Sequence, residues 1–436
     1  MTTSRRTFLG GAAAMAGISA LPACEVSAAV RPRRKPGEKM RLLVIGVGGR
    51  GRANLNGVKG EDIRVLCDVD SVHLAAAAKD FPAARTIADH RLILCDREAC
   101  AELDGVVIST PDHSHYLPAM LALKQRLDVY CEKPLTHTVA QARRLMTTAA
   151  LQGCVTQMGI QIHANENFRR VVEAVAAGAV GAVREVYVFV NGTDWSAKEL
   201  PPEIEVPERL DYDLWLGPVA SRPFREGYHP AAWRRYWAFG GGTTADMGCH
   251  YTDLAFWALG LTAPVALVAD GDEPHAECAP RGMRCSYEFA ARGQQPALSL
   301  HWHAGSDRPQ AALAERGLEK WTNGVLFIGD DGWLISNYDK HEVGPAARAA
   351  AWTAPAKSIA ASPGHYKEWI DCCRDRTQPS CSFAYGAPLT EHVLLATAAF
   401  RAAKGRRLMW DAAAMKFDDE AATALLEEPA RKGFTA

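Results

Sequence analysis

The sequence has almost no net charge, and beyond its first thirty residues it has no long apolar run. Its 436 residues include 49 Lys and Arg against 50 Asp and Glu, a formal net charge of −1 at pH 7. Proteins that bind nucleic acid usually concentrate basic residues on one face, so we expect no nucleic-acid partner. A membrane-spanning helix needs about 20 consecutive apolar residues, which the chain beyond residue 30 does not offer.

Cysteine pairs with metal-ligand spacing are also missing. None of the 12 cysteines belongs to a Cys-x-x-Cys motif, so we expect no zinc site and no other metal. The spacings do not suggest a disulfide framework either, and Cys67, Cys131 and Cys154 lie in or beside apolar, strand-like runs. We therefore predict buried free thiols, and we interpret the adjacent Cys372 and Cys373 as structural.

The first residues have the layout of a bacterial twin-arginine export signal. Arg5 and Arg6 precede "TFLGGAAAMAGISALPAC", a mildly apolar stretch that is too short and too rich in small residues for a stable transmembrane helix. We predict a signal peptide over residues 1–29 and a solvated linker over 30–39.

This signal implies a periplasmic or other extracytoplasmic location and makes the twin-arginine export machinery a partner. Cleavage near Ala28 or Ala29 would release the mature chain. The sequence "LPAC" also leaves open a lipoprotein cleavage site at Cys24.

The remaining length suits two domains, and the first, residues 40–160, has the pattern of a nucleotide-binding fold. Short β-type runs alternate with helical runs, which favours a doubly wound parallel sheet of the Rossmann type. The expected strands are RLLVIGV, IRVLCDVD, GVVIST, LDVYCEK and CVTQMG. Among the helices, SVHLAAAAKDF is expected to be capped by Ser71, and TVAQARRLMTTAALQ to end at Gly153.

A glycine-rich turn follows the first of these strands and opens a helix. Gly46, Gly48 and Gly51 of "GVGGRG" match the dinucleotide fingerprint, in which glycines let backbone N–H groups approach a pyrophosphate. Gly49 and Arg50 belong to the same turn. Asp68 ends the second strand, where a carboxylate can bind the adenosine ribose and would repel a 2′-phosphate. The pattern therefore favours NAD over NADP.

Two loops at the carboxyl ends of strands are candidates for ligand binding, because open α/β sheets bind ligands at that edge. One is "STPDHSHY" (109–116) and the other is "CEKPLTHT" (131–138). In the second, Lys133 precedes Pro134, which stiffens the loop and holds the ammonium near the sheet edge.

The second half changes character and predicts a separate substrate domain over residues 161–420, followed by a tail over 421–436. After a helix at "ENFRRVVEAVAAGAVG", longer strand-like runs favour an α+β domain with a large, mostly antiparallel sheet. These runs are PVALVADG, MRCSYEFAA, ALSLHWHAG and NGVLFIGDDGWLISN.

A polar stripe in "GGGTTADMGCHYTDLAFW" (240–257) is the strongest catalytic candidate. On a helix that begins near Thr243 or Thr244, spacings of four, three and four align Asp246, His250, Asp253 and Trp257. We expect this stripe to face a cleft, with His250 and a neighbouring Asp serving in proton transfer and Asp253 within reach of substrate. Lys133 could stabilise negative charge that develops on the same substrate oxygen.

The motifs "GVGGRG", "TPDHSH", "CEKP" and "GGGTTADMGCH", in this order, resemble the glucose–fructose oxidoreductase / inositol dehydrogenase / MocA (Gfo/Idh/MocA) family. The resemblance implies an N-terminal Rossmann domain and a C-terminal domain whose open sheet often mediates homo-oligomerisation. It also implies a Lys-Asp-His site, which maps onto Lys133, Asp246 and His250, with His250 as general base. Positions that line the cofactor site map onto Thr110, Pro111, His115 and Glu132, and positions near nicotinamide or substrate map onto Gln161, Trp233 and Arg234.

Three hypotheses for function follow. The leading one is an NAD-dependent oxidoreductase acting on a secondary hydroxyl of a sugar, sugar derivative or cyclitol. Because no free nicotinamide pool exists outside the cytoplasm, we expect a tightly held cofactor that is recycled in place. The second is an NAD-dependent glycoside hydrolase or lyase that works by transient oxidation and elimination, and the third is a catalytically silent sugar-binding protein.

Overall fold

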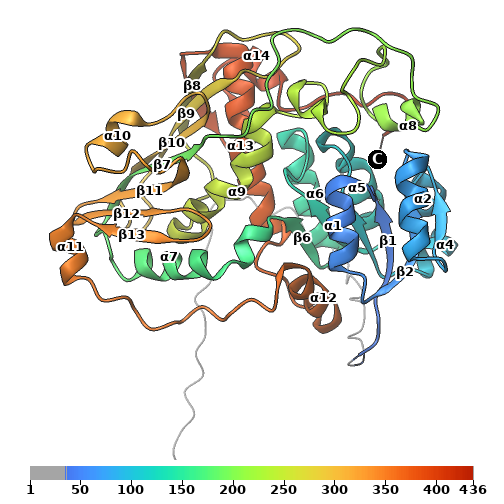
Figure 1. Ribbon diagram of the computed structural model, residues 1–436, viewed down its shortest axis with the longest axis horizontal. Helices are drawn as coiled ribbons and strands as arrows, with labels where there is room; N and C mark the ends of the chain where they lie inside the picture. Colours follow the sequence, from blue (N-terminus) through green and yellow to red (C-terminus); the bar gives the residue numbers. More distant parts are fainter. Residues whose placement is uncertain (1–34, 36, 436) are drawn as a thin grey trace, which may run out of the picture.

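The computed structural model describes residue 35 and residues 37–435, which form two sheets joined by helices (Figure 1). The predicted export signal and Cys24 lie outside the described residues. Across the part of the chain that is described, no helix combines the length and the apolar character that crossing a membrane requires.

The first sheet has six parallel strands in the order β3-β2-β1-β4-β5-β6, the order of a doubly wound dinucleotide-binding fold. All five expected strands are present, and the short β3 at the edge was not predicted. The strands are β1 (Arg41–Ile45), β2 (Asp62–Cys67), β3 (Arg85–Ile87), β4 (Gly105–Ile108), β5 (Asp128–Glu132) and β6 (Thr156–Gly159).

Helices cover both faces of this sheet. Successive side chains of a strand point to opposite faces, and in these strands the side chains on both faces are largely apolar and buried. One face packs on α1, α2 and, from far along the sequence, α12; the other packs on α5 and α6. The helices are α1 (Gly49–Gly57), α2 (Ser71–Asp80), α3 (Arg91–Leu94), α4 (Arg97–Ala101), α5 (Tyr116–Lys124), α6 (Val139–Gln152) and α12 (His365–Asp375).

Two predicted helix ends can be checked directly. Gly153 ends α6 in the left-handed conformation, with φ of 64°, as expected. The predicted cap of α2 is wrong by one residue: Ser71 is the first helical residue, and the Asp70 carboxylate accepts hydrogen bonds from the N–H groups of Val72 and His73. Asp is among the preferred N-cap residues, because its carboxylate accepts hydrogen bonds from the free N–H groups of the first turn.

The second sheet has nine strands in the order β13-β12-β11-β7-β10-β9-β8-β14-β15. Only the central β7 and β10 run parallel, so the sheet is mostly antiparallel and the predicted fold class is confirmed. The strands are β7 (Val183–Val190), β8 (Ala266–Gly271), β9 (Gly282–Phe289), β10 (Leu298–Gly305), β11 (Asn323–Gly329), β12 (Gly332–Ser336), β13 (His341–Gly344), β14 (Arg407–Asp411) and β15 (Lys416–Phe417).

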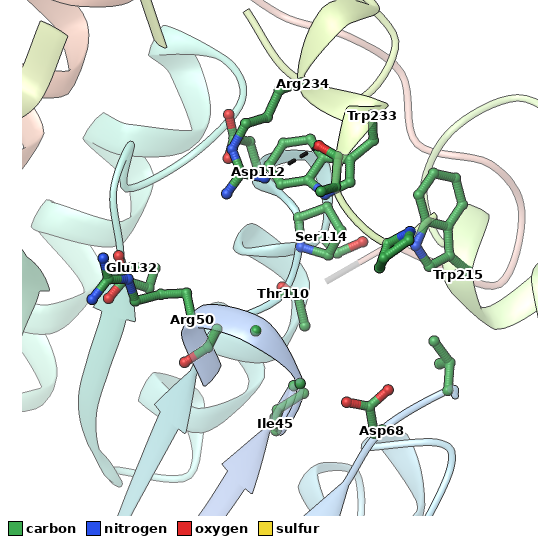
Figure 2. Close-up of a pocket in the computed structure, with 18 of the residues that line it drawn as sticks. Ile45, Arg50, Asp68, Thr110, Asp112, Ser114, Glu132, Trp215, Trp233 and Arg234 are labelled. Carbon is green, nitrogen blue, oxygen red and sulfur yellow. Dashed lines mark hydrogen bonds between the residues drawn. The ribbon is translucent and has the colours of Figure 1, made fainter. Parts of the chain in front are cut away.

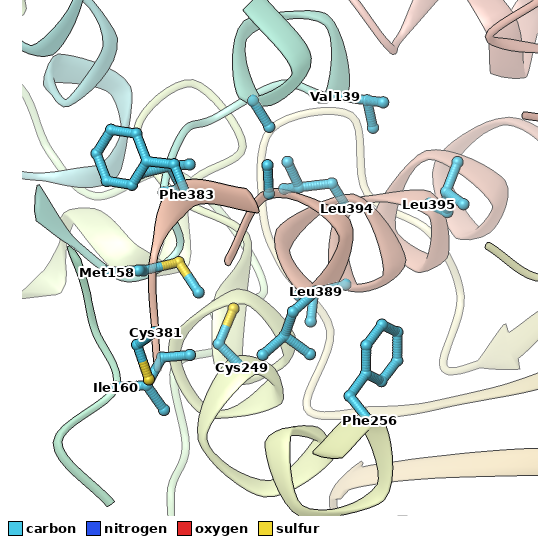
Figure 3. Packing of buried hydrophobic residues seen from close by; sticks show 14 of the residues in the cluster. Val139, Met158, Ile160, Cys249, Phe256, Cys381, Phe383, Leu389, Leu394 and Leu395 are labelled. Atoms are coloured by element: carbon cyan, nitrogen blue, oxygen red, sulfur yellow. The ribbon is translucent and has the colours of Figure 1, made fainter. Parts of the chain in front are cut away.

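Two long helices, α9 and α13, join the sheets into one hydrophobic core. Figure 3 shows Cys249 and Phe256 of α9 beside Leu389 and Leu394 of α13, with Met158 of the first sheet in the same cluster. The remaining helices are α7 (Glu166–Ala176), α8 (Tyr212–Leu216), α9 (Gly242–Leu259), α10 (Gln310–Ala314), α11 (Ala346–Ala351), α13 (Phe383–Ala403) and α14 (Glu420–Ala424), with short 3₁₀ turns η1 (Asp112–Ser114), η2 (Gln161–Ala164) and η3 (Ala232–Arg235).

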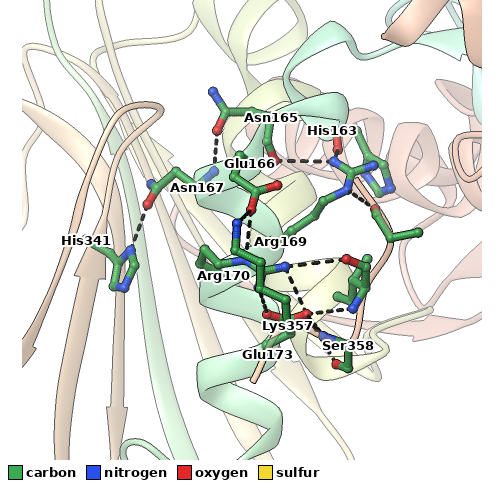
Figure 4. Close-up of polar contacts among 12 residues, drawn as sticks. His163, Asn165, Glu166, Asn167, Arg169, Arg170, Glu173, His341, Lys357 and Ser358 are labelled. Carbon is green, nitrogen blue, oxygen red and sulfur yellow. Dashed lines mark hydrogen bonds and ion pairs between the residues drawn. The ribbon is translucent and has the colours of Figure 1, made fainter. Parts of the chain in front are cut away.

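An extended segment after α11 crosses helix α7, and α7 in turn fixes the turn η2, which borders the site described below (Figure 4). The backbone N–H groups of Ser358 and Ile359 each donate to the Glu173 carboxylate at 2.6 Å. On the same helix, the Arg169 guanidinium donates to the His163 carbonyl at 2.8 Å. Charged groups on α7 therefore hold the connection between the two sheets in place.

The cysteine prediction holds within the described residues. Their eleven cysteines are all free, and nine of them are buried; Cys95 is exposed and Cys372 is partly exposed.

Candidate active site

A large cavity of about 1120 Å³ opens at the carboxyl ends of the first sheet's strands (Figure 2). Residues from the Rossmann sheet form one wall, and residues from the connection between β7 and α9 form the other. Small-molecule pockets commonly measure about 300–1,000 Å³, so this cavity has room for a dinucleotide together with a second small molecule.

The glycine turn forms the floor of this cavity. Gly46 has a φ of +78°, which favours glycine, and a Cβ there would lie 2.6 Å from the Ser109 carbonyl oxygen. Gly48, Gly49 and Arg50 also line the cavity, directly at the N-terminus of α1. Free N–H groups at a helix N-terminus attract anions such as a pyrophosphate.

Gly51, predicted to bind cofactor, does not line the cavity. A Cβ on Gly51 would lie 1.9 Å from the Gly46 carbonyl oxygen, so this glycine lets the first helical turn pack against the glycine turn itself. Its role is to shape the turn from behind.

We expect Gly46→Ala to weaken NAD binding by about tenfold or more and to destabilise the fold by about 1–3 kcal/mol, because the new methyl group meets backbone in a strained conformation. Gly60→Ala is the control, since Gly60 has open space around its Cβ position and no positive φ. Titration with NAD and thermal unfolding of both variants measure the two effects. Equal behaviour of the two variants would contradict this reading of the turn.

Asp68 and Thr110 present polar groups that fit a bound dinucleotide. Asp68 lines the cavity, and its carboxylate accepts from the N–H groups of Val47 and Asp70 at 2.8 and 2.9 Å, which fixes it beside the glycine turn. The Thr110 hydroxyl lines the same cavity and is buried without a hydrogen-bond partner in the described chain. A buried hydroxyl without a partner is costly, so a ligand with polar atoms suits this position.

The predicted Lys133 and Asp246 meet at the inner end of the cavity. The Lys133 ammonium donates to the Asp246 carboxylate at 2.7 Å and to the Asp246 carbonyl at 2.6 Å. An ammonium has three N–H groups, so one remains for an oxygen atom in the cavity. Burial opposes the charge on Lys133, but Asp246 and Asp112 outweigh that effect and raise the pKa of the ammonium.

Asp246 is also held by the second wall of the cavity. Its carboxylate accepts from the Arg234 guanidinium at 3.1 Å and from the Trp195 indole N–H at 2.8 Å. Although burial works against ionisation, Lys133 and Arg234 keep the pKa of Asp246 below its usual value. The Arg234 guanidinium lies over the Trp233 ring at 4.2 Å and the Trp195 ring at 5.2 Å, so these groups form one rigid assembly.

His250 lies one helical turn beyond Asp246 and lines the same cavity. Burial, followed by the nearby Lys133 charge, lowers its pKa to about 3, so its imidazole is neutral near pH 7 and has an unprotonated ring nitrogen that can accept a hydrogen bond. Its Nδ1 is buried without a hydrogen-bond partner in the described residues.

His250 lies beside Asp246, but no hydrogen bond joins the two side chains in the described part of the chain. Asp246 accepts from Lys133, Arg234 and Trp195 instead, and the bonds from the two charged donors are stronger than one from a neutral imidazole.

The predicted cleft-facing stripe is wrong beyond His250. Asp253 is fully buried and accepts from the Tyr385 hydroxyl at 2.6 Å, with the His163 ring nitrogen at 2.9 Å. Trp257 stacks on the same His163 ring at 4.0 Å. A helix rises about 1.5 Å per residue, so the later turns of α9 run past the cavity and into the core. Asp253 therefore does not reach a substrate.

The other residues implied by the family resemblance divide into two groups. Pro111, Glu132, Gln161 and Trp233 line the cavity. Glu132 accepts from the side-chain amides of Gln161 at 2.7 Å and Asn54 at 2.9 Å, so it orients other groups at the floor. His115 is buried outside the lining, and its ring nitrogens lie 2.8 Å from the carbonyl oxygens of Thr110 and Pro134. It ties the two strand-end loops together.

Several lining residues were not predicted from sequence. Trp195 lies in the chain after β7, Tyr338 lies two residues after the end of β12, and Phe434 belongs to the predicted tail. Asp112 lies inside the loop 109–116 that the sequence pointed to, and burial raises its pKa to about 7. His301 and Trp302, which lie on β10, are not part of the lining.

Two family models match the sequence that builds this site. The NAD-binding Rossmann fold of an oxidoreductase family matches residues 40–160, and the C-terminal alpha/beta domain of that family matches residues 165–298. Together they cover more than half of the chain.

The chain belongs to the Gfo/Idh/MocA oxidoreductase family.

Individual members of the Gfo/Idh/MocA family show how far the likeness extends. An inositol 2-dehydrogenase of Leifsonia xyli subsp. xyli is 31% identical over 192 residues, which are 41% of this chain and 55% of the relative. The chain spans about half the length of the curated relatives that it matches first.

Solved structures show the same fold over nearly their whole length. The WlbA dehydrogenase from Bordetella pertussis, in complex with NADH and UDP-GlcNAcA, is 16% identical with a TM-score of 0.60, over 86% of this chain and 98% of that chain. A levoglucosan dehydrogenase in complex with NADH and levoglucosan is 17% identical with a TM-score of 0.58, over 85% and 99%. The family's first domain is an NAD-binding fold, and the glycine turn, Asp68 and Thr110 belong to it here.

Proposed function

We propose that this protein is an NAD-dependent dehydrogenase that oxidises a secondary hydroxyl of a sugar, a sugar derivative or a cyclitol. One observation carries the proposal: Lys133, which follows β5, and Asp246, on helix α9, are in contact beside a neutral His250 in the cavity that the NAD-binding fold contributes. The names of the relatives, an inositol 2-dehydrogenase among them, support this class of substrate.

Each residue of the site has a separate role in the proposed reaction. Bound NAD would supply the hydride acceptor. His250 takes the hydroxyl proton, since its neutral form is the one present near pH 7. The third N–H of Lys133 donates to the same substrate oxygen and stabilises the negative charge that develops there. Asp246 keeps Lys133 in position, and it is itself held by Arg234 and Trp195.

Aromatic and cationic groups opposite the Rossmann wall form the proposed substrate side. Trp195, Trp233 and Tyr338 provide apolar surface, and Arg234 provides a polar contact among them. Small-molecule sites commonly combine apolar walls with a few fixed polar groups, which decide how a ligand is oriented.

We further propose that the chain is exported through the twin-arginine machinery with its cofactor already bound, and that the cofactor is recycled by a second substrate. We therefore expect chain recovered from the periplasmic fraction to release about one nicotinamide dinucleotide per molecule when denatured. The control is the double variant Arg5→Lys, Arg6→Lys, which should remain in the cytoplasm. An exported chain free of nucleotide would contradict a retained cofactor.

The activity itself is tested with a panel of sugars and cyclitols, with and without added NAD. Keto-sugar or polyol products support net oxidation and reduction. Release of a free aglycone from glycosides would instead favour cleavage by transient oxidation and elimination. Light scattering on the same preparation tests the homo-oligomer that the family resemblance implies.

A further inference from the structure

One end of the cavity is closed by parts of the chain that do not belong to the Rossmann domain. Beyond Asp68, the lining continues over Ala88 and His90 after β3 and over Leu117 and Pro118 of α5. In this fold an acidic residue after β2 binds the adenosine ribose, so the space beyond it is the adenine end. There the opposite wall comes from Trp215, which Figure 2 shows across the cavity from Asp68, and from Phe434.

The C-terminal residues 431–434 are fastened to this wall by several contacts. The Arg431 N–H donates to the Pro218 carbonyl at 2.8 Å, and its guanidinium donates to the carbonyls of Asp213 at 2.8 Å and Gly217 at 3.1 Å. These residues belong to α8 and its end, so the C-terminal residues and the α8 region form one structure.

The same residues are fastened to the Rossmann domain on the other side. The Arg91 guanidinium of α3 donates to the Gly433 carbonyl at 2.7 Å and lies 4.3 Å from the centre of the Phe434 ring. The Arg431 guanidinium lies 4.6 Å from the centre of the same ring. Phe434 is thereby held at 7% exposure in the cavity wall.

The connection between β7 and α9 is likewise fastened to the N-terminus of α2. The His229 ring lies 2.8 Å from the Asp70 carboxylate, and the Asp211 N–H donates to the Val69 carbonyl at 3.0 Å. Asp70, His73 and His229 together resemble a metal donor set, with ligand atoms within 4.8 Å of one another. The Arg209 guanidinium lies 3.5 Å from the same Asp70 oxygen, and its positive charge disfavours a metal ion at these three residues.

Two polar atoms at this end have no partner in the described chain. The His90 Nε2 and the Trp215 indole N–H are both buried, and both residues line the cavity. Burial lowers the pKa of His90 to about 4, so its ring is neutral. Adenine offers an amino donor and ring-nitrogen acceptors, which suit a neutral imidazole and an indole N–H.

We propose that residues 431–434, together with Trp215 and His90, form the adenine end of the dinucleotide site and that the C-terminal residues retain the cofactor. This inference rests on the proposed function, since it assumes that NAD occupies the cavity. The nucleotide leaves only when the contacts of Arg431 and Phe434 open, so its release is slower than from a site open to solvent.

The test is the release of bound NADH, followed by its fluorescence on mixing with excess NAD. We expect Phe434→Ala and Arg431→Gln each to speed release by about tenfold or more, the effect of losing about one net contact. Phe417→Ala is the matched control, because Phe417 is 5% exposed, lies on β15 near the same terminus and does not line the cavity. Equal release rates for Phe434→Ala and Phe417→Ala would overturn the proposal.

A second measurement uses the unaltered chain and stays informative if a variant does not fold. Bound NAD should slow hydrogen exchange at the N–H groups of Arg431 and Phe434, which donate to Pro218 and Arg431 respectively. Unchanged exchange there would overturn the role of the C-terminal residues. A wild-type chain that binds no NADH would overturn the proposed function itself, which keeps the two failures distinct.

Discussion

Replacing His250 by Asn is expected to lower kcat by about 10²- to 10⁴-fold, the usual contribution of a positioned general base. Asn cannot accept the hydroxyl proton, whereas the neutral imidazole of His250 can. Affinity for NADH should change little, because the glycine turn, Asp68 and Thr110 are untouched. Steady-state kinetics on the best substrate, with NADH titration beside it, measures both quantities.

His303→Asn provides the matched control for this change. His303 lies on β10, outside the cavity lining, and its Nδ1 is 2.7 Å from the Asp307 carboxylate. We expect kcat of His303→Asn to stay within about twofold of the wild type, since His303 does not line the cavity in which the reaction is proposed to occur. A His250→Asn enzyme with full turnover would remove the assigned base.

Replacing Lys133 by Met is expected to lower kcat/KM by about 10²- to 10³-fold, the range measured for removal of one donor that stabilises a developing oxyanion. Methionine retains the apolar stem of the side chain but no N–H group. Asp246 would still be held by Arg234 and Trp195, so the chain should fold. The measurement is kcat/KM together with thermal unfolding.

The same variant should also change the pH profile in a defined direction. Burial and then the Lys133 charge lower the pKa of His250 from its ordinary 6.5 to about 3. Removing the charge makes protonation of His250 easier, so the acid limb of kcat moves to higher pH in Lys133→Met. Lys367→Met, which removes an exposed lysine paired with Asp371 on α12, is the control and should leave rate and profile unchanged. An unshifted limb in Lys133→Met would show that the two groups do not interact.

The local sequence was sufficient for the fold class and for most elements. Alternating β-type and helical runs of a few residues each reflect apolar periodicity, which depends only on near neighbours. The strand-turn-helix at Gly46 and the acidic residue at the end of β2 were visible for the same reason. The three-residue β3 was missed because so short a run carries almost no periodic signal.

For the polar stripe on α9, helical spacing predicted which residues share a face but not which of them line the cavity. Helical spacing placed Asp246, His250 and Asp253 correctly on one face, and only the first two line the cavity. Which turns of a helix are exposed to a cavity depends on the segments that pack against the helix. Here His163 and Tyr385 contact Asp253 and cover the later turns of α9. Lys133 was grouped with Asp246 in advance, but the further contacts of Asp246 with Arg234 and Trp195 were not foreseen, because helical spacing does not place those two segments.

Short-range patterns in the chain thus specified two sheets, a dinucleotide turn, and the residue types that oxidation of an alcohol requires. Folding alone brought Lys133 to Asp246 and Phe434 to the far end of the cavity, across 113 and more than 300 residues of chain respectively. The reason is physical. Side chains interact through space, so contacts between distant segments depend on the packing of whole sheets and helices, which no local stretch of sequence contains.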